Sequence, residues 1–199
     1  MKQSDFEIGQ GVSLETADGL FLFRYASLNS REALIVSNNL DAENKIKVRI
    51  HSSCVFSESF HTIDCDCSDQ LNDAIKSIGK EKGVIIYLFD EGRGIGLKKK
   101  LEAIRIQKEL ELNTAEAFEK LGFKSDERSF ELAIAILKSL YSEKEIELIT
   151  NNPLKVDKLK EAGIKISSIV KSVHTKNATV KQYLLEKKTF LGHIIELND

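Results

Sequence analysis

The sequence predicts a single α/β domain over residues 1–199, built on a mixed sheet whose N-terminal strands are antiparallel. Short runs rich in branched and aromatic side chains fill the first quarter of the chain, as in antiparallel strands. From residue 83 onward, apolar runs are followed by a polar or glycine-rich loop and then by helical periodicity. Because α/β proteins bind nucleotides at such junctions, we expect strand-loop-helix nucleotide-binding units in this part.

Three N-terminal runs are predicted strands, at residues 20–25, 33–37 and 46–51. Each is short and dominated by side chains that favour extended backbone. Asn38-Asn39 and the polar run from Asp41 to Asn44 separate the second run from the third, as turn residues do.

Composition and charge exclude several classes of partner. The 199 residues carry a net charge of -2 with a pI near 6.1, so we expect no nucleic-acid partner and no membrane-surface partner. The first ten residues lack the apolar core of a signal peptide, and no apolar run is long enough to span a bilayer. We therefore expect a cytoplasmic protein.

All three cysteines lie between Arg49 and Gln70. Cys65 and Cys67 flank one residue, so extended backbone would point both sulfurs to one side, where Cys54 could meet them from the end of a preceding strand. Converging thiolates favour zinc, and three protein ligands leave a fourth tetrahedral position open for water, as catalytic sites require. An odd number of cysteines without a secretory signal also disfavours a disulfide framework.

Two other interpretations of the cysteines stay open. A structural zinc site would need a fourth protein ligand, which His51 or His61 could supply. Alternatively, the thiols are unrelated and simply buried, as free cysteines often are. Helical periodicity at residues 71–78 predicts a helix that begins right after Cys67 and ends between Gly79 and Gly83, and its positive N-terminal end would stabilise nearby thiolates.

A glycine loop follows the apolar run at residues 84–89. Gly92, Gly94 and Gly96 end that predicted strand and open a helix from residue 97, where backbone N–H groups can bind phosphate. Arg93 in the loop and the lysines at residues 98–100 favour an anionic ligand. The alternative is a tight turn followed by a solvated basic helix face, because the spacing matches neither the dinucleotide fingerprint nor the Walker pattern.

A second unit begins with the predicted strand at residues 146–150. Asn151-Asn152 before Pro153 is typical of a helix start, and the helix is expected to end at Gly163, followed by a strand at residues 164–170. The stretch from Thr150 to Pro153 is either only a helix cap or a polar loop where α/β proteins place ligands, with Lys155 one turn further on.

Apolar side chains at residues 130, 133, 134 and 137 predict one more amphipathic helix between the two units. Asp126 and Glu127 would lie at its start, where acids suit the helix dipole. Arg128 in the first turn would oppose the dipole, which hints at a function, the alternative being a salt bridge to a neighbouring acid. The sequence assigns no role to His174 or His193.

Five motifs, in this order and at these separations, resemble the GTP cyclohydrolase II family of riboflavin biosynthesis. They are R-I-H-S-S-C, D-C-D-C-S-D-Q-L, E-G-R-G-I-G-L, L-G-F-K-S-D-E-R and L-I-T-N-N-P-L-K, and the match runs from Gly19 to F-L-G-H near the end. The resemblance implies that one Zn²⁺ per chain, held by three cysteines, activates water against C8 of GTP. Formate then leaves the opened ring, pyrophosphate is lost from the triphosphate, and Mg²⁺ assists at the phosphates.

The resemblance also implies roles for individual residues. The zinc ligands would be Cys54, Cys65 and Cys67. The catalytic positions would be Asp126, in proton transfer, and Arg128, in attack on the α-phosphate. The substrate-binding positions would be Arg49, Ile50, His51, Ser52, Ser53, Gln70, Glu91, Gly92, Arg93, Thr114, Thr150 and Lys155. The family likeness further implies a homodimer.

The chain departs from the family pattern near the expected site. Ser53 replaces a glutamate, Ser68 a glycine, Phe89-Asp90 an Arg-Gln pair, and Phe118 an amide. The family's tyrosine aligns with Ile104, whose side chain makes no hydrogen bond. Leu97, Leu101 and Ile104 share a helical face, so the simplest interpretation makes Ile104 a core residue on a helix that also borders the site.

Two alternatives to the full reaction therefore stay open. One is a diverged enzyme that stops at the ring-opened formamide or omits pyrophosphate release. The other is a protein that binds zinc and nucleotide without turnover. Retention of all three cysteines together with Asp126 and Arg128 favours an enzyme.

Overall fold

The computed structural model describes residues 5–38, 44–124 and 126–195. Within these residues, eight strands form one sheet in the order β1-β3-β4-β6-β5-β7-β8, with β2 also paired to β3. The strands are β1 (Phe6–Ile8), β2 (Val12–Thr16), β3 (Gly19–Leu28), β4 (Arg31–Ser37), β5 (Lys45–Ser52), β6 (Gly83–Leu88), β7 (Glu145–Ile149) and β8 (Ile166–Val170). The sheet is mixed, which confirms the predicted fold class.

The sheet has an antiparallel half and a parallel half. β1 and β2 pair with β3, β3 pairs with β4, and β4 pairs with β6, all antiparallel. β6, β5, β7 and β8 run parallel. Because the carboxyl ends of parallel strands meet at one edge, the loops that carry Cys54, Glu91 and Thr150 lie at the same end of the sheet.

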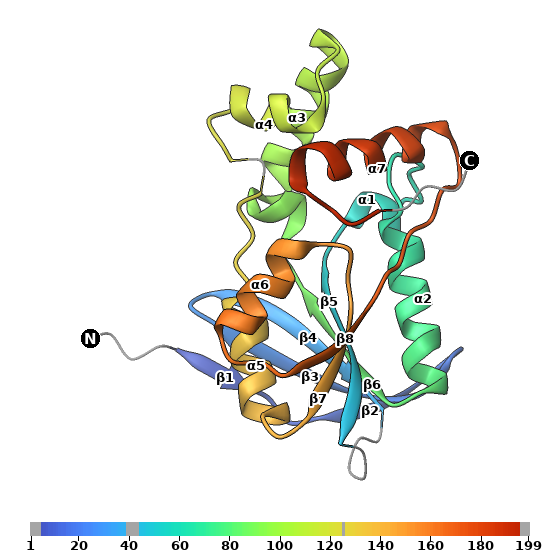
Figure 1. Cartoon of the computed structure of the whole chain (residues 1–199), viewed down its shortest axis with the longest axis vertical. Coiled ribbons are helices and arrows are strands. Elements are labelled where there is room, and N and C mark those ends of the chain that lie inside the picture. The colour runs from blue at the N-terminus through green and yellow to red at the C-terminus, as the bar shows by residue number, and fades with distance from the viewer. Residues whose placement is uncertain (1–4, 39–43, 125, 196–199) are drawn as a thin grey trace.

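The helices cover both faces and one end of the sheet. They are α1 (Val55–Glu58), α2 (Cys67–Lys80), the 3₁₀ helix η1 (Glu91–Gly94), α3 (Gly96–Leu110), α4 (Thr114–Lys120), α5 (Glu131–Tyr141), α6 (Pro153–Glu161) and α7 (Ala178–Leu191). α2 lies on one side of the sheet and α5 and α6 on the other, while α1, α3, α4 and α7 gather at one end (Figure 1). No helix in the described part of the chain is long and apolar enough to cross a membrane.

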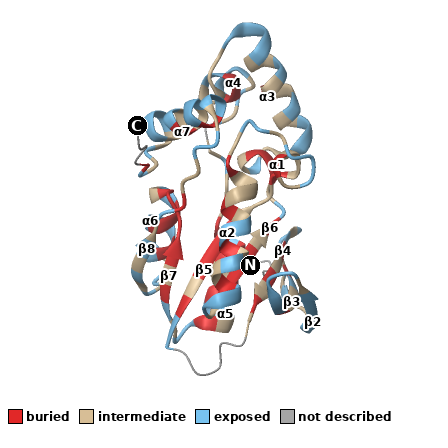
Figure 2. Cartoon of the chain, turned by 90° about the vertical axis from the view of Figure 1, so that its right-hand side faces the viewer, coloured by how far each residue is buried: buried red, intermediate tan, exposed pale blue. Residues whose placement is uncertain are grey.

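Alternating side chains of β6 explain the two-sided core. Val84 and Ile86 join the cluster on the α5 side, whereas Ile85 packs with Ala74 and Ile78 of α2. All five are at most 2% exposed, and the buried residues run along the central strands (Figure 2). A strand buried on both faces is continuously apolar, which is why the sequence around residue 85 predicts it.

Most predicted elements are confirmed, with somewhat different bounds. The predicted strands at residues 20–25, 33–37, 46–51, 84–89, 146–150 and 164–170 correspond to β3, β4, β5, β6, β7 and β8. The predicted helices correspond to α2, α3, α5 and α6, and α2 begins at Cys67 itself. Asn39 and residues 41–43 of the expected turn lie outside the described residues. The sequence did not predict β1, β2, α1, α4 or α7.

Two local expectations were wrong. α5 has Phe130 as its N-cap and begins at Glu131, so Asp126 does not cap it and Arg128 is not in its first turn. The dipole argument for Arg128 therefore fails, and its position must be explained by the site. Asp66 has φ -98° and ψ 14°, so Cys65 and Cys67 do not share an extended strand. Instead, the turn into α2 brings their sulfurs together.

Candidate active site

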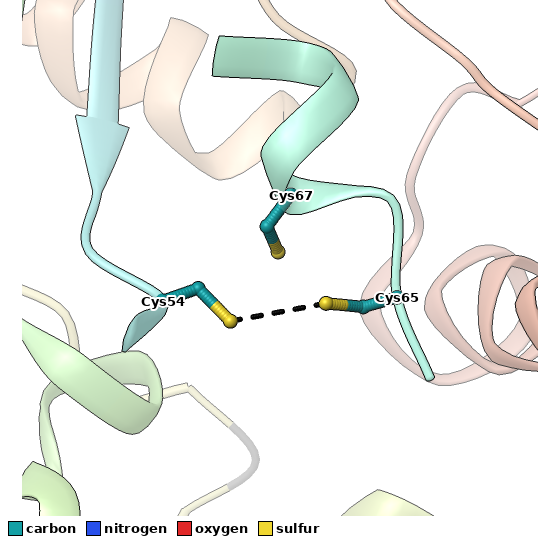
Figure 3. A group of neighbouring side chains, drawn as sticks. All are labelled: Cys54, Cys65 and Cys67. Carbon is teal, nitrogen blue, oxygen red and sulfur yellow. Dashed lines mark hydrogen bonds between the residues drawn. The ribbon is translucent and has the colours of Figure 1, made fainter. Parts of the chain in front are cut away.

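The three cysteines converge although they come from different elements (Figure 3). Cys54 follows β5 and is the N-cap of α1, Cys65 lies in the loop before α2, and Cys67 is the first residue of α2. Their sulfurs all lie within 4.8 Å of one another, and the Sγ atoms of Cys54 and Cys65 are 3.8 Å apart. The side chains therefore form one potential ligand set.

The geometry and chemistry of this set fit zinc. A tetrahedral centre with Zn–S bonds of about 2.3 Å holds its sulfurs roughly 3.8 Å apart, and thiolate sulfur is a preferred ligand of zinc. The thiols already share their protons unequally: hydrogen bonding with Cys54 lowers the pKa of Cys65 and raises that of Cys67. When a metal cation binds to such thiols, it displaces their protons.

Neither histidine considered for a structural site joins the sulfurs. His51 Nε2 lies 2.8 Å from Glu58 Oε1, and its Nδ1 lies 3.5 Å from an Arg49 nitrogen. His61 is exposed. Within the described residues, the metal-ligating group consists of the cysteines alone. The geometry thus favours three protein ligands, rather than a four-ligand structural site or unrelated thiols.

A lysine from α3 lies against the cysteines. Lys100 Nζ is 3.2 Å from Cys54 Sγ and 2.6 Å from Glu91 Oε1. Burial opposes its charge, but the Cys54 sulfur and the hydrogen bond to Glu91 outweigh burial and raise the pKa of Lys100. A neighbouring ammonium group stabilises a thiolate. Of the basic run at residues 98–100, only Lys100 lines the cavity described below.

Glu58 ties three parts of the site together. Its Oε1 accepts hydrogen bonds from the Cys54 backbone N–H at 3.0 Å and from His51 Nε2 at 2.8 Å. Its Oε2 accepts from the Tyr87 hydroxyl at 2.6 Å. Groups that orient a ligand in this way stabilise a metal site. Sequence reasoning missed Glu58 because a single acid in a short irregular segment forms no pattern.

A cavity of about 780 Å³ lies at this end of the sheet, within the size range of small-ligand sites. The three cysteines and Arg128 line it. So do the following predicted substrate-binding residues: Arg49, Ile50, His51, Ser52, Ser53, Gln70, Gly92, Arg93, Thr114, Thr150 and Lys155. Glu91 and Asp126 do not line it, although each is bonded to a cation that does.

Asp126 and Arg128 form a bidentate ion pair. Arg128 Nε donates to Asp126 Oδ1 at 2.8 Å, and Arg128 Nη2 donates to Oδ2. Burial opposes ionisation of Asp126, but the hydrogen bonds from Arg128 outweigh burial and lower its pKa. The salt bridge that the sequence offered as an alternative is therefore present. It also presents a fixed cation to the cavity, so the bridge does not exclude a role in binding.

Two buried cations lie beside this pair. Lys155 is 4% exposed and its Nζ donates to the Ile50 carbonyl at 2.7 Å. Arg49 donates to Gln70 Oε1 at 2.6 Å and to the Ile149 carbonyl at 3.2 Å. Burial, together with the charges of Arg49 and Arg128, lowers the pKa of Lys155 well below its usual range. An anionic ligand would offset this crowding of positive charge.

The glycine loop is fixed against the segment that carries Arg128. Gly94 has φ +92°, and a Cβ there would lie 2.8 Å from the Glu127 carbonyl oxygen, so the backbones approach too closely for a side chain. The Arg93 carbonyl accepts a hydrogen bond from the Glu127 N–H at 3.1 Å. The Arg93 guanidinium lies 5.4 Å from the ring centroid of Phe118. Arg93 is thereby held at the cavity.

The sequence predicted that the helix carrying Ile104 borders the site, which α3 does, but it missed the cavity wall formed by α7. Ile104 lines the cavity, and Leu97 and Leu101 on the same face of α3 are 48% and 51% exposed. The interpretation of this face as core was therefore wrong, because α3 projects beyond the sheet (Figure 1). α7 contributes Tyr183, Lys187 and its C-terminal neighbour His193. The resemblance reached F-L-G-H, which contains His193, but assigned none of the three a role.

A family model described as GTP cyclohydrolase II matches residues 10–171. The chain belongs to the GTP cyclohydrolase II family. The resemblance drawn from five motifs is thus confirmed. The motifs supply the three cysteines and several of the basic residues that line the cavity, whereas α7 lies beyond the matched region.

Relatives of known name differ in how much of them the chain covers. A GTP cyclohydrolase-2 of Campylobacter hominis is 36% identical over 98% of this chain and 98% of the relative. A GTP cyclohydrolase-2 of Archaeoglobus fulgidus is 44% identical, and the chain covers 43% of it. A riboflavin biosynthesis protein RibBA of Endomicrobium trichonymphae is 38% identical, and the chain covers 46% of it. The chain thus spans nearly all of one relative and less than half of the other two.

Among solved structures, one similar chain is RibBX, a two-domain 3,4-dihydroxy-2-butanone 4-phosphate synthase from A. baumannii. Its TM-score is 0.47 at 15% identity, and the match covers 87% of this chain and 41% of that one.

The departures from the GTP cyclohydrolase II pattern fall in two places. Phe89 is 52% exposed and Asp90 lies 3.5 Å from Arg31, and neither residue lines the cavity. Ser53, Ile104 and Phe118, in contrast, line it. The substitutions that bear on the cavity are therefore Ser53, after β5, and those in α3 and α4.

Proposed function

We propose that this chain hydrolyses the imidazole ring of GTP, releases formate and pyrophosphate, and leaves a diaminopyrimidine ribosyl phosphate, the first step of riboflavin biosynthesis. The observation that carries the proposal is that three sulfurs within 4.8 Å of one another share a cavity with Arg93, Arg128 and Lys155. The three sulfurs suit a metal, and the three cations suit phosphate. Membership of the GTP cyclohydrolase II family supports the same reaction.

The cysteines are the residues to hold one Zn²⁺ per chain. When bound, zinc supplies a Lewis acid that activates water for hydrolysis. Lys100 contacts this ligand set directly, since its ammonium nitrogen lies 3.2 Å from the Cys54 sulfur. Glu58 fixes the backbone of Cys54 through a 3.0 Å hydrogen bond. Both contacts keep the ligand set assembled.

The phosphates of GTP are assigned to Arg93, Arg128 and Lys155, which are basic residues of the cavity lining. Arg128, fixed by Asp126, contacts the α-phosphate, and Asp126 is the ionised base beside it. Arg93 and Lys155 bind the remaining phosphate oxygens. Mg²⁺ is assigned to the phosphates themselves, because it is commonly bound through substrate phosphates and the described residues offer no acidic cluster for it.

A second candidate is a diverged enzyme that opens the ring and stops at the formamide. The observation that favours it is the presence of Ile104 in the cavity wall. An aliphatic side chain transfers no proton. Expelling formate needs a second hydrolytic step, which an acid or base group accelerates.

The deciding experiment is to incubate purified, zinc-loaded protein with GTP and Mg²⁺ and to identify the products by mass and ultraviolet spectrum. The first proposal predicts formate, pyrophosphate and the diaminopyrimidine. Accumulation of the formamide would support the second candidate. Unchanged GTP in the presence of fully occupied zinc would overturn both.

A further inference from the structure

The C-terminal segment, residues 172–195, forms one wall of the cavity although the family match ends at residue 171. α7 lies across the end of the sheet close to the start of α2 (Figure 1). Its residues Tyr183 and Lys187, and His193 after it, line the same cavity as the cysteines and Arg128. The motifs of the family therefore leave this wall without an assigned role.

The segment is fastened to the rest of the site at several points. The side chain of Asn151 accepts a hydrogen bond from the Ser172 N–H at 3.0 Å, and its backbone carbonyl accepts one from the Ile194 N–H at 3.0 Å. Glu186 Oε2 accepts from the Thr114 hydroxyl at 2.9 Å. The wall is thus positioned by residues on both sides of the cavity.

The Lys187 side chain is largely buried and lines the cavity. Its side chain is 11% exposed, and its Nζ lies 3.4 Å from Asp66 Oδ1 and 4.2 Å from the ring centroid of Tyr183. Lys188, the next residue, is exposed. A distance of 3.4 Å to one carboxylate oxygen leaves most of the hydrogen-bonding capacity of an ammonium group, which has three donors, unused. Burying a lysine without further partners is costly.

His193 is placed beside Lys187 by the end of the helix. Gly192 has φ +64°, a conformation that glycine adopts readily, and the chain turns back so that the His193 N–H donates to the Lys187 carbonyl at 3.2 Å. The His193 Nε2 atom is buried and has no hydrogen-bond partner among the residues that the structure describes. Buried polar atoms are normally paired. This nitrogen therefore points to a missing ligand atom.

Positive charge surrounds this nitrogen. Burial lowers the pKa of His193 to about 3, with further contributions from Lys187, Arg128, Lys155 and Arg93. Asp66 contacts Lys187 and Asp126 contacts Arg128, and two further acids, Asp64 and Glu186, line the cavity. Among the described residues that line the cavity, seven are lysine or arginine and two are aspartate or glutamate, so the field is positive, and a polyanion is the class of ligand that offsets it.

We propose that Lys187 and His193 form a phosphate-binding subsite, in which the C-terminal segment contacts the phosphate chain of a nucleoside triphosphate. The proposal rests on the proposed function, because it assigns these residues to the same substrate. Lys187 donates to a phosphate oxygen, and the imidazole Nε2, as its N–H tautomer, donates to another. α7 thereby closes the cavity over the substrate.

The test compares Lys187→Met with Lys188→Met, the same substitution one residue further along the helix, in full-length zinc-loaded protein. Isothermal titration calorimetry measures binding of GTP, guanosine and inorganic tripolyphosphate, with zinc content checked after each titration. We expect Lys187→Met to weaken GTP and tripolyphosphate by about tenfold to a hundredfold, the scale of a charge-assisted hydrogen bond. Guanosine affinity should stay unchanged, and Lys188→Met should match the unmodified protein.

Two further variants separate binding from folding. Lys187→Arg keeps the charge and should recover most of the tripolyphosphate affinity. If Lys187 were only a structural partner of Asp66, substitutions at Lys187 would not change the affinity for tripolyphosphate. His193→Phe keeps an aromatic ring and removes Nε2, and should weaken tripolyphosphate a few-fold. Equal tripolyphosphate affinity in Lys187→Met and Lys188→Met would overturn the subsite, as would an equal loss of guanosine binding.

The outcome also separates this proposal from the proposed function. If GTP is turned over with the same KM in Lys187→Met and Lys188→Met, the subsite is wrong and the enzyme assignment stands. If the protein does not turn GTP over but binds tripolyphosphate in a Lys187-dependent way, the enzyme assignment is wrong and the anion subsite stands.

Discussion

Asn151 binds Ser172 in both directions: its side-chain Nδ2 donates to the Ser172 carbonyl and its Oδ1 accepts from the Ser172 N–H. Its own carbonyl accepts from the Ile194 N–H. Asn152, the next residue, does what a helix cap does and accepts from the Leu154 N–H at 3.0 Å. The two asparagines that the sequence left ambiguous therefore have separate tasks, and Asn151 fixes the C-terminal wall of the cavity.

Asn151→Ala should loosen that wall. Both side-chain hydrogen bonds to Ser172 are lost and a buried N–H is left unpaired, which costs about 1 to 3 kcal/mol. Hydrogen exchange should accelerate across residues 172–195, and GTP affinity should fall with it. Asn152→Ala is the control, because it removes a cap worth about 1 kcal/mol without touching Ser172. Equal exchange of α7 in the two variants would contradict this role of Asn151.

The sequence predicted the parts of the fold that follow from local pattern. Strands such as β6 are apolar because both faces are buried, and helices such as α2 show a clear apolar stripe. β1 and β2 were missed because they lie at the edge of the sheet, where all five residues of β2 are exposed or half-buried and no alternation remains. α7 was missed for a related reason: Val180 and Leu184 are its only fully buried residues within the described chain.

The site was predictable where one motif carries several functional groups. Cys54, Cys65 and Cys67 lie within fourteen residues, and the structure brings their sulfurs within 4.8 Å. Glu58 and His193 were not predictable, since each acts through a contact made only in three dimensions. The sequence analysis singled out Arg128 because it was expected in the first turn of a helix. That argument was wrong, because α5 begins at Glu131, although Arg128 does line the cavity.

Replacing any one cysteine should remove most of the zinc. In Cys67→Ser the hydroxyl is a much poorer ligand than a thiolate, and two remaining sulfurs do not hold the ion as tightly. Metal analysis of the purified protein should give about one zinc per chain for the unmodified protein and well below that for the variant. Ser68→Ala, the neighbouring position, serves as control. Full zinc occupancy in Cys67→Ser would rule out the ligand assignment.

Arg93→Ala should weaken nucleotide binding by about 1.5 to 3 kcal/mol, the scale of a charge-assisted hydrogen bond. Arg93 lines the cavity, whereas Lys98 is exposed and does not. Lys98→Ala is therefore a control that removes one positive charge from the same region. Calorimetric titration with GTP measures both. If the two variants bind GTP equally well, the phosphates lie elsewhere.

Arg128→Ala should abolish pyrophosphate release while zinc binding is kept. The substitution removes the cation assigned to the α-phosphate and leaves Asp126 buried without its partner, so some loss of stability is expected as well. Arg128→Lys keeps the charge but not the two-sided contact with Asp126, and should recover stability more than activity. If a folded Arg128→Ala protein releases pyrophosphate at the native rate, Arg128 serves only as the structural ion-pair partner of Asp126.

Ile104→Tyr should shift the products from the formamide toward formate. Ile104 lines the cavity on α3, so a tyrosine there would bring a hydroxyl group to the substrate. An added acid or base group typically contributes about 10² to 10⁴ in rate to the step it serves. Ring opening should change little, because it depends on the metal assigned to the three cysteines. Ile104→Phe adds the ring without the hydroxyl and is the matched control.

Time-resolved product analysis of GTP turnover decides this prediction. The unmodified protein and Ile104→Phe should accumulate formamide before formate, and Ile104→Tyr should release formate without that delay. Prompt stoichiometric formate from the unmodified protein would show that another group already serves the second step. Asp126 is one candidate, because it is bonded to Arg128, which lines the cavity, and that bond lowers the pKa of Asp126. Asp90 is the other. The Ile104 substitution would then be a change in the cavity wall without a chemical consequence.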